Sequence, residues 1–198
     1  MKTRILLLIA VIAMYSCGEP IAYKYQNKEM DIACAGIDPS LLKEALYSFE
    51  NDISAYYNNE QYSPGSAVYF EFGYANFIYP GATGTADYAK IASSHTIAIM
   101  DILKKEESLW NKNAKDSKLN YKHPFVKCLI ENIDNKEIKE KIETLQSVNY
   151  FTPTIMSEFY RVHVGDALTD KHFALFIALE TYYQNLLEID FSAMSKNE

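Results

Sequence analysis

Four histidines are the residues of this chain best suited to metal binding or acid–base catalysis: His95, His123, His163 and His172. His95 stands out because it falls on the apolar side of a predicted helix, together with Ile99 and Ile102. A buried imidazole can act as a metal ligand or a general base, and a carboxylate such as Glu71 or Asp101 could accompany it. The simpler interpretation is a core histidine that hydrogen-bonds to a carbonyl or to a tyrosine hydroxyl.

The other three histidines fit roles at helix ends. His123 precedes a proline at the start of a predicted helix and suits a cap, and His163 lies near a helix end, where the helix dipole favours a cation. His172 falls in the first turn of the last predicted helix. The sequence contains no HExxH, no paired ExxH, no GxSxG and no Walker loop. It therefore predicts no metal site and no cofactor, and a histidine cluster would require the fold to bring distant positions together.

Aromatic residues are abundant, with sixteen tyrosines and ten phenylalanines, and they are concentrated between positions 62 and 79. Aromatic rings stack on sugars and dominate many protein interfaces. The sequence thus offers a candidate aromatic binding surface made of Tyr69, Phe72, Tyr74 and Tyr79. The alternative is that these side chains fill the core of a tyrosine-rich domain.

The conformation of this aromatic stretch is ambiguous from its pattern. Val68 to Tyr79 fits a strand by residue propensity, and it also fits one face of a helix. A single strand cannot satisfy its backbone hydrogen bonds, and no second strand is indicated elsewhere. We therefore predict a helix over this stretch.

The N-terminus has the pattern of an export signal. Lys2 and Arg4 precede an apolar run of ten residues from Ile5 to Met14. At about 1.5 Å per residue this run covers only half of a bilayer core of roughly 30 Å, so it is too short to span a membrane. Residues 1–16 are therefore predicted to be a signal peptide.

The run ends in Met14-Tyr15-Ser16-Cys17, which resembles the lipobox of bacterial lipoproteins. In that family the cysteine thiol is acylated, the chain is cut just before it, and the new amino group is acylated too. The resemblance implies an exported protein that is lipidated at Cys17 and held at the bacterial cell envelope by its acyl chains. Gly18 replaces the aspartate of the inner-membrane retention signal, so the outer membrane is the expected location. The alternative is an ordinary signal peptide cut near a cysteine.

Net charge limits the choice of partners. The formal charge of the whole chain is −7, and the signal peptide contributes two of the positive charges. A domain this acidic lacks the basic surface that nucleic acids require, so no nucleic-acid partner is expected. Charge will not attract it to an anionic bilayer either, which leaves membrane attachment to the lipid anchor.

The cysteine count indicates a disulfide. If Cys17 is lipidated, Cys34 and Cys128 remain, and an exported protein meets an oxidising compartment. A bond between them would close a loop of about 95 residues, which the chain-entropy model equates with roughly 4–5 kcal/mol. The alternative is a pair of buried free thiols.

Apolar residues recur at helical spacing along most of the chain, which predicts an all-α fold: a single irregular bundle of about six helices. The longest predicted helix runs from Thr85 to Leu109. The last, capped by Thr169, is apolar over more than half its circumference and should lie at the centre of the bundle. The segment from Asn111 to Lys122 is polar and is predicted to be a loop.

These patterns divide the chain into a signal peptide (1–16), a lipidated cysteine with a flexible tether (17–35) and a helical domain (36–198). We interpret the protein as a lipid-anchored cell-envelope module that binds a protein or glycan partner or has a structural role, because no catalytic motif is present. The alternative is an envelope enzyme or metal-binding protein that uses a buried His95. Metal analysis and the effect of His95→Ala on ligand binding would separate the two.

Overall fold

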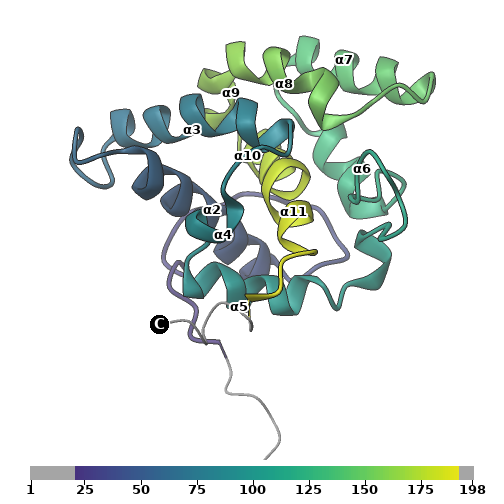
Figure 1. Ribbon diagram of the computed structural model, residues 1–198. Helices are drawn as coiled ribbons and strands as arrows, with labels where there is room; N and C mark the ends of the chain where they lie inside the picture. The colour runs from purple at the N-terminus through teal and green to yellow at the C-terminus, as the bar shows by residue number, and fades with distance from the viewer. Residues whose placement is uncertain (1–20, 192–198) are drawn as a thin grey trace, which may run out of the picture.

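A computed structural model describes residues 21–191 of the chain (Figure 1). In this part the fold is all-α, as predicted, and the only β-type pairing is an isolated antiparallel bridge between Trp110 and Leu119. None of the helices between residues 21 and 191 has the length and apolar composition that a bilayer-spanning segment needs. The predicted signal peptide and Cys17 lie outside the described residues.

The helices are labelled as in Figure 1, with η for short non-α helices. In chain order they are α2 (Pro39–Tyr57), α3 (Ala67–Ala82), α4 (Tyr88–Ile91), α5 (Ser94–Leu103), η2 (Glu107–Leu109), α6 (Pro124–Glu131), α7 (Lys136–Ser147), α8 (Pro153–Val162), α9 (Val164–Thr169), α10 (Lys171–Ile177), η3 (Ala178–Tyr183) and α11 (Gln184–Leu186).

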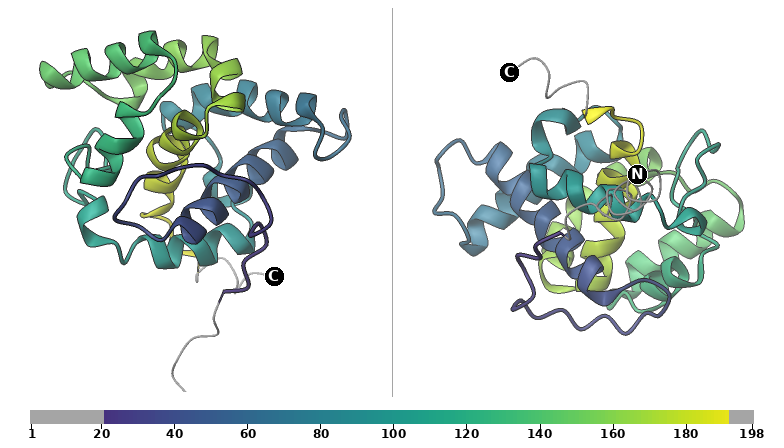
Figure 2. Two further views of the ribbon diagram at one scale, coloured as in Figure 1. Left: turned by 180° about the vertical axis from the view of Figure 1, so that it is seen from behind. Right: turned by 90° about the horizontal axis from the view of Figure 1, so that it is seen from below.

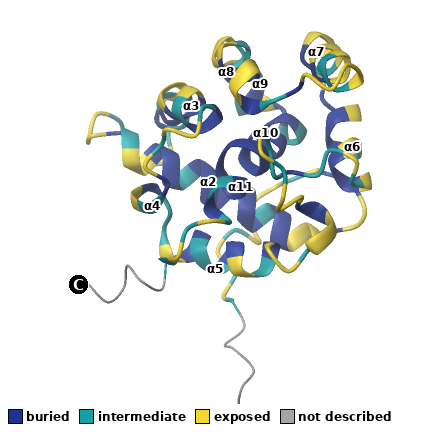
Figure 3. Ribbon diagram, turned by 45° about the vertical axis from the view of Figure 1, so that its right-hand side comes forward, coloured by how far each residue is buried: buried dark blue, intermediate teal, exposed yellow. Residues whose placement is uncertain are grey.

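The last three of these helices form one continuous rod through the middle of the bundle (Figure 1). Its side chains, Phe173 and Phe176 among them, are almost all buried, and Figure 3 shows the rod surrounded by the other helices. The central position of the last helix is therefore confirmed. Asp170 caps the rod by accepting hydrogen bonds from the backbone N–H groups of His172 and Phe173, in place of the predicted Thr169. The η3 segment is a π-helix, a widened turn that is rare and often found at functional sites.

The aromatic stretch is helical, as predicted, and it crosses closely over α2. The Ser66 hydroxyl caps α3 by accepting a hydrogen bond from the backbone N–H of Tyr69. At the crossing, a Cβ atom on Gly73 would come within 2.4–2.9 Å of three Ser54 atoms, so only glycine fits. Packing against α2 thus decides the conformation against the β-propensity of the residues.

The prediction of a single helix from Thr85 to Leu109 is wrong, because the structure divides this range into α4, α5 and η2. The break falls at Ser93, whose hydroxyl accepts a hydrogen bond from the Thr96 N–H and begins α5. The Ser93 N–H donates to Asp52 of α2. Side-chain capping here overrides the apolar periodicity, and His95 lies in the first turn of a helix instead of the middle of one.

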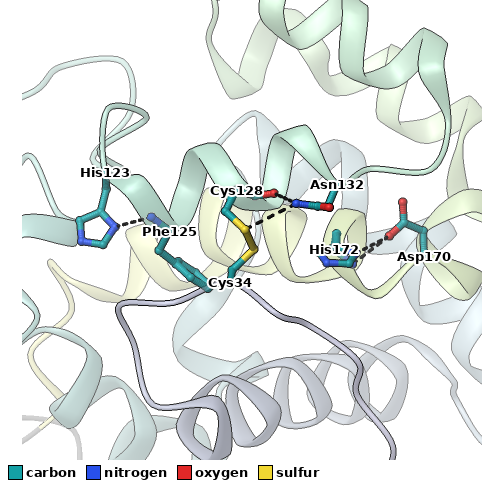
Figure 4. Close-up of a disulfide and its surroundings, with 7 residues drawn as sticks. All are labelled: Cys34, His123, Phe125, Cys128, Asn132, Asp170 and His172. Carbon is teal, nitrogen blue, oxygen red and sulfur yellow. Dashed lines mark hydrogen bonds and ion pairs between the residues drawn. A yellow bond between two sulfur atoms is a disulfide. The ribbon is translucent and has the colours of Figure 1, made fainter.

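Residues 21–35 pack along the helical domain, whereas the sequence suggested a flexible tether. Figure 2 shows this segment wrapping across α2 towards α6. Ile32 and Cys34 are buried, and Tyr47 of α2 donates a hydrogen bond to the carbonyl of Glu29. The predicted disulfide joins Cys34 to Cys128 of α6 (Figure 4). The described part of the expected tether therefore belongs to the folded domain.

Candidate functional site

His95 is buried, as predicted, and its partner is a carboxylate that the sequence did not suggest. His95 Nε2 lies 2.8 Å from Glu44 Oε2, and the Glu44 side chain is fully buried in α2. Glu71 is exposed on α3, and Asp101 forms an exposed ion pair with Lys104. Neither of the two carboxylates proposed from the sequence therefore accompanies His95.

The His95–Glu44 pair holds the N-terminal segment in place. Glu44 Oε2 accepts a hydrogen bond of 2.9 Å from the Lys24 N–H, and Oε1 accepts one of 2.6 Å from the Tyr25 N–H. The Tyr25 ring then packs edge-on against the His95 ring. Both carboxylate oxygens are thus occupied by groups of the protein itself, and the arrangement is that of a structural clamp.

The remaining histidines do not converge on His95. His123 caps α6, as predicted, with Nδ1 accepting a hydrogen bond from the Phe125 N–H (Figure 4). His163 Nδ1 lies 2.9 Å from Asp166 Oδ2, and His172 lies next to Asp170. Within residues 21–191, no group of three or more His, Cys, Asp or Glu side chains is placed to hold a metal ion.

The four residues of the candidate aromatic surface do not share one face. Tyr69 and Tyr74 are buried, and Tyr74 donates a hydrogen bond of 3.2 Å to the buried carboxylate of Glu50. Phe72 is half-buried, and only Tyr79 is widely exposed. The core-filling interpretation is therefore correct for Tyr69 and Tyr74, because the helix turns them towards α2.

A more suitable place for a ligand is a surface pocket of about 460 Å³ at the other side of the bundle. It is lined by residues of the 111–122 loop, by Lys127 of α6, by Gln146 of α7, and by Asn149 and Phe151. We call it the Tyr121 pocket. Its volume lies within the range of about 300–1,000 Å³ that is usual for small-molecule sites.

Aromatic rings form one wall of the Tyr121 pocket. The rings of Tyr121 and Phe151 meet edge to face with their centroids 5.0 Å apart, and both pack against Phe176 of the central rod. This contact with the core fixes the two rings. A rigid aromatic wall is a suitable surface for the apolar face of a sugar ring.

Behind Tyr121 lies a carboxylate that is buried without a cation. Tyr121 Oη donates a hydrogen bond of 2.8 Å to Glu180 Oε1, and Tyr160 Oη donates one of 2.5 Å to Oε2. Glu180 belongs to the π-helical turn and is fully buried, and no cationic side chain in the described part of the chain pairs with it. Burial raises the pKa of Glu180 to about 7, although the two tyrosine hydrogen bonds oppose this rise.

The loop that carries Tyr121 is fixed to the central rod. Gln184 Oε1 of α11 accepts hydrogen bonds of 2.6 Å from the Lys118 N–H and 2.9 Å from the Ser117 hydroxyl. The Trp110–Leu119 bridge closes the base of the loop. The polar loop predicted from the sequence is therefore held in a defined shape beside the pocket.

One hydrogen-bond donor at the pocket lacks a partner. Gln146 Nε2 is buried, and no acceptor in the described residues reaches it. A buried polar group without a partner costs about 1–3 kcal/mol, so such groups are uncommon unless a bound molecule satisfies them. An ordered water or a ligand with an acceptor atom would satisfy this amide.

The sequence patterns did not identify four residues of these sites, namely Tyr121, Gln146, Glu180 and Glu44. For Glu180 a signal was present, because it is a lone acid within the most apolar helix of the chain. Tyr121 and Gln146 lie in polar surroundings where nothing in the local sequence distinguishes them. Comparison of the chain with known protein families, curated proteins and solved structures found no match.

Proposed function

We propose that this protein is a lipid-anchored module of the bacterial cell envelope that binds a saccharide in the Tyr121 pocket. The resemblance of residues 14–17 to a lipobox supports export and lipidation at Cys17. The Cys34–Cys128 disulfide is consistent with an oxidising compartment outside the cytoplasm. The outer membrane is the location that Gly18 favours, and the acyl chains provide the attachment.

The observation that carries the saccharide proposal is the combination of an aromatic wall with amide side chains that have no protein partner. Asn111, Gln146 and Asn149 line the pocket, and none of their side chains hydrogen-bonds to another residue between positions 21 and 191. An amide both donates and accepts hydrogen bonds, as sugar hydroxyls do. The pocket thus offers aromatic rings that can contact the apolar face of a sugar and amide side chains that can hydrogen-bond to its hydroxyls.

Binding is a better account of these side chains than catalysis. His95 and Glu44 could act as an acid–base pair, but Glu44 accepts hydrogen bonds from the backbone N–H groups of residues 24 and 25 and holds that segment in place. Glu180 lies behind the Tyr121 ring, and Asp116 is the single carboxylate among the residues that line the pocket. General acid–base catalysis requires a group within hydrogen-bond reach of the substrate, usually with a second group to complement it.

A saccharide array followed by titration calorimetry tests the proposal. We expect the purified protein to bind a saccharide and expect Gln146→Ala and Asn149→Ala each to weaken binding about five- to tenfold, since each removes one hydrogen bond. Asn76→Ala is a matched control, because Asn76 is exposed on α3 and its side chain bonds only to the Phe72 carbonyl of its own helix. Failure to bind any saccharide, or equal losses in all three variants, would contradict the proposal.

A protein partner is a second candidate, favoured by a separate observation. The segment 148–162 carries four large apolar side chains that are 41–66% exposed, namely Val148, Tyr150, Ile155 and Val162. Exposed apolar side chains mark a protein contact surface where they form one contiguous patch. We expect Tyr150→Ser with Val162→Ser to abolish a protein cross-link formed in intact envelopes while leaving saccharide affinity unchanged. Retention of every cross-link in this double variant would argue against the second candidate.

A further inference from the structure

We propose that the Tyr121 pocket selects acidic saccharides, which carry a carboxylate on the sugar ring. This inference rests on the proposed saccharide function and specifies its ligand. It follows from the charge, the pairing state and the hydrogen-bonding capacity of the side chains that line the pocket.

The pocket is locally basic in an acidic protein. Lys115, Lys122 and Lys127 line it together with a single acid, Asp116. The chain as a whole carries a formal charge of −7. Positive charge concentrated in one hollow attracts anions to that hollow, and the negative charge on the rest of the surface repels them.

These lysines are not neutralised by neighbours. None of Lys115, Lys122 and Lys127 forms an ion pair with another residue between positions 21 and 191. Lys118 of the same loop shows the contrast, because its ammonium group lies 2.5 Å from Glu188 Oε1. The three ammonium groups at the pocket therefore remain free to pair with a bound anion.

The unpaired Gln146 amide at the pocket is compatible with a carboxylate ligand. Gln146 Nε2 is buried and lacks an acceptor, and a carboxylate presents two oxygens that accept several hydrogen bonds. Bonds to an ionised acceptor are also stronger than bonds to a neutral hydroxyl. Tyr121 directs its own hydroxyl at Glu180, so its contribution to the ligand is the ring. A sugar ring against Tyr121 with its carboxylate near Gln146 and the lysines would satisfy each of these groups.

Matched ligands test the charge preference on the unaltered protein. The probes are glucuronic acid, galacturonic acid and N-acetylneuraminic acid, as free sugars and short oligomers, each compared with its methyl ester. We expect at least one acid to bind about tenfold more tightly than its ester, and this advantage to fall as salt is raised, since partly exposed ion pairs are screened. Equal affinity of every acid and its ester would overturn the inference while the saccharide function stands. No binding of any saccharide would overturn the function itself.

Variants locate the preference in the pocket. Lys115→Gln, Lys122→Gln and Lys127→Gln combined should remove the tenfold advantage of the acid over its ester. Lys136→Gln, Lys139→Gln and Lys141→Gln change the net charge equally on the first half of α7 and should leave the advantage intact. An equal loss in both triple variants would show that overall charge, and not this pocket, attracts the acid, and would overturn the inference.

Discussion

Tyr121 Oη donates a hydrogen bond of 2.8 Å to Glu180 Oε1, and this bond connects the wall of the surface pocket to the π-helical turn in the core. Glu180 also accepts the hydroxyl of Tyr160, so both carboxylate oxygens are occupied from within. Burial and the nearby Glu180 carboxylate raise the pKa of Tyr121 well above its usual value, which keeps the hydroxyl protonated as a donor. The hydroxyl of one residue in the aromatic wall is therefore held by a buried acid.

Glu180 should make the stability of the protein fall as pH rises. Its pKa is about 7 in the folded protein, against an ordinary value of 4.5 for a glutamate side chain, so the folded state binds the proton more tightly. The stabilising contribution is complete below about pH 4.5, declines between about pH 4.5 and 7, and is lost above the folded pKa. A shift of this size corresponds to roughly 3 kcal/mol.

Glu180→Gln removes this titration and keeps the shape of the side chain. Relative to the unaltered protein, the variant should gain roughly 3 kcal/mol of unfolding free energy between about pH 4.5 and pH 8, measured by urea denaturation at several pH values. Glu50 and Asp52, whose pKa values burial also raises, titrate in both proteins and cancel in the difference. A difference that does not change with pH would show that Glu180 titrates as an exposed group.

Glu44 should be essential for the ordered path of the N-terminal segment. Glu44→Ala removes the acceptor of the Lys24 and Tyr25 N–H groups and the partner of His95, so we expect a loss of about 2–4 kcal/mol in unfolding free energy. Amide hydrogen exchange at residues 24 and 25 should accelerate at the same time. Asp101→Ala, which breaks an exposed ion pair, should change stability by less than about 0.5 kcal/mol. Unaltered exchange at both amides in Glu44→Ala would refute the clamp.

The disulfide should contribute substantially to stability, because it closes a loop spanning 94 positions. Cys34→Ala combined with Cys128→Ala should lower the unfolding free energy by about 2–5 kcal/mol, and chemical reduction of the unaltered protein should match the double variant. Thiol titration of the denatured, unreduced protein should find neither cysteine reactive. Two reactive thiols at these positions would contradict the pairing.

Lipidation at Cys17 remains a prediction from the leader. Cys17→Ser should abolish labelling by a radioactive fatty acid and move the protein from the membrane fraction to the soluble fraction, because two or more acyl chains are needed for stable attachment. Export should persist, since the apolar run from Ile5 to Met14 is unchanged. Membrane retention of the variant, together with no label on the unaltered protein, would contradict the lipoprotein interpretation.

Local signals in the sequence were sufficient for much of the fold. His123 caps α6 ahead of Pro124, because the groups that form the cap lie within a few positions of one another. The disulfide was predictable from the number of cysteines that remain when Cys17 is set aside. The all-α class followed from the apolar periodicity.

Contacts between distant segments could not be predicted in the same way. Glu44 and His95 are 51 positions apart, and nothing near either residue identifies the other as its partner. The burial of Tyr69 and Tyr74 depends on where α2 crosses α3. The Tyr121 pocket joins the 111–122 loop to the end of α7, so it exists only once the bundle has assembled.

If the Tyr121 pocket binds a saccharide, the side-chain amide of Gln146 lies beside the bound sugar. In ¹⁵N-labelled protein, the side-chain amide signals of Gln146 should shift when a saccharide identified by the array is added, together with backbone signals of the 111–122 loop. Gln146→Met should weaken saccharide binding about five- to tenfold, as Gln146→Ala does, and leave the free protein equally stable or more stable by up to about 1–2 kcal/mol, because a buried unpaired donor is removed. Shifts confined to other parts of the molecule, with full binding by Gln146→Met, would show that the saccharide does not bind in the Tyr121 pocket.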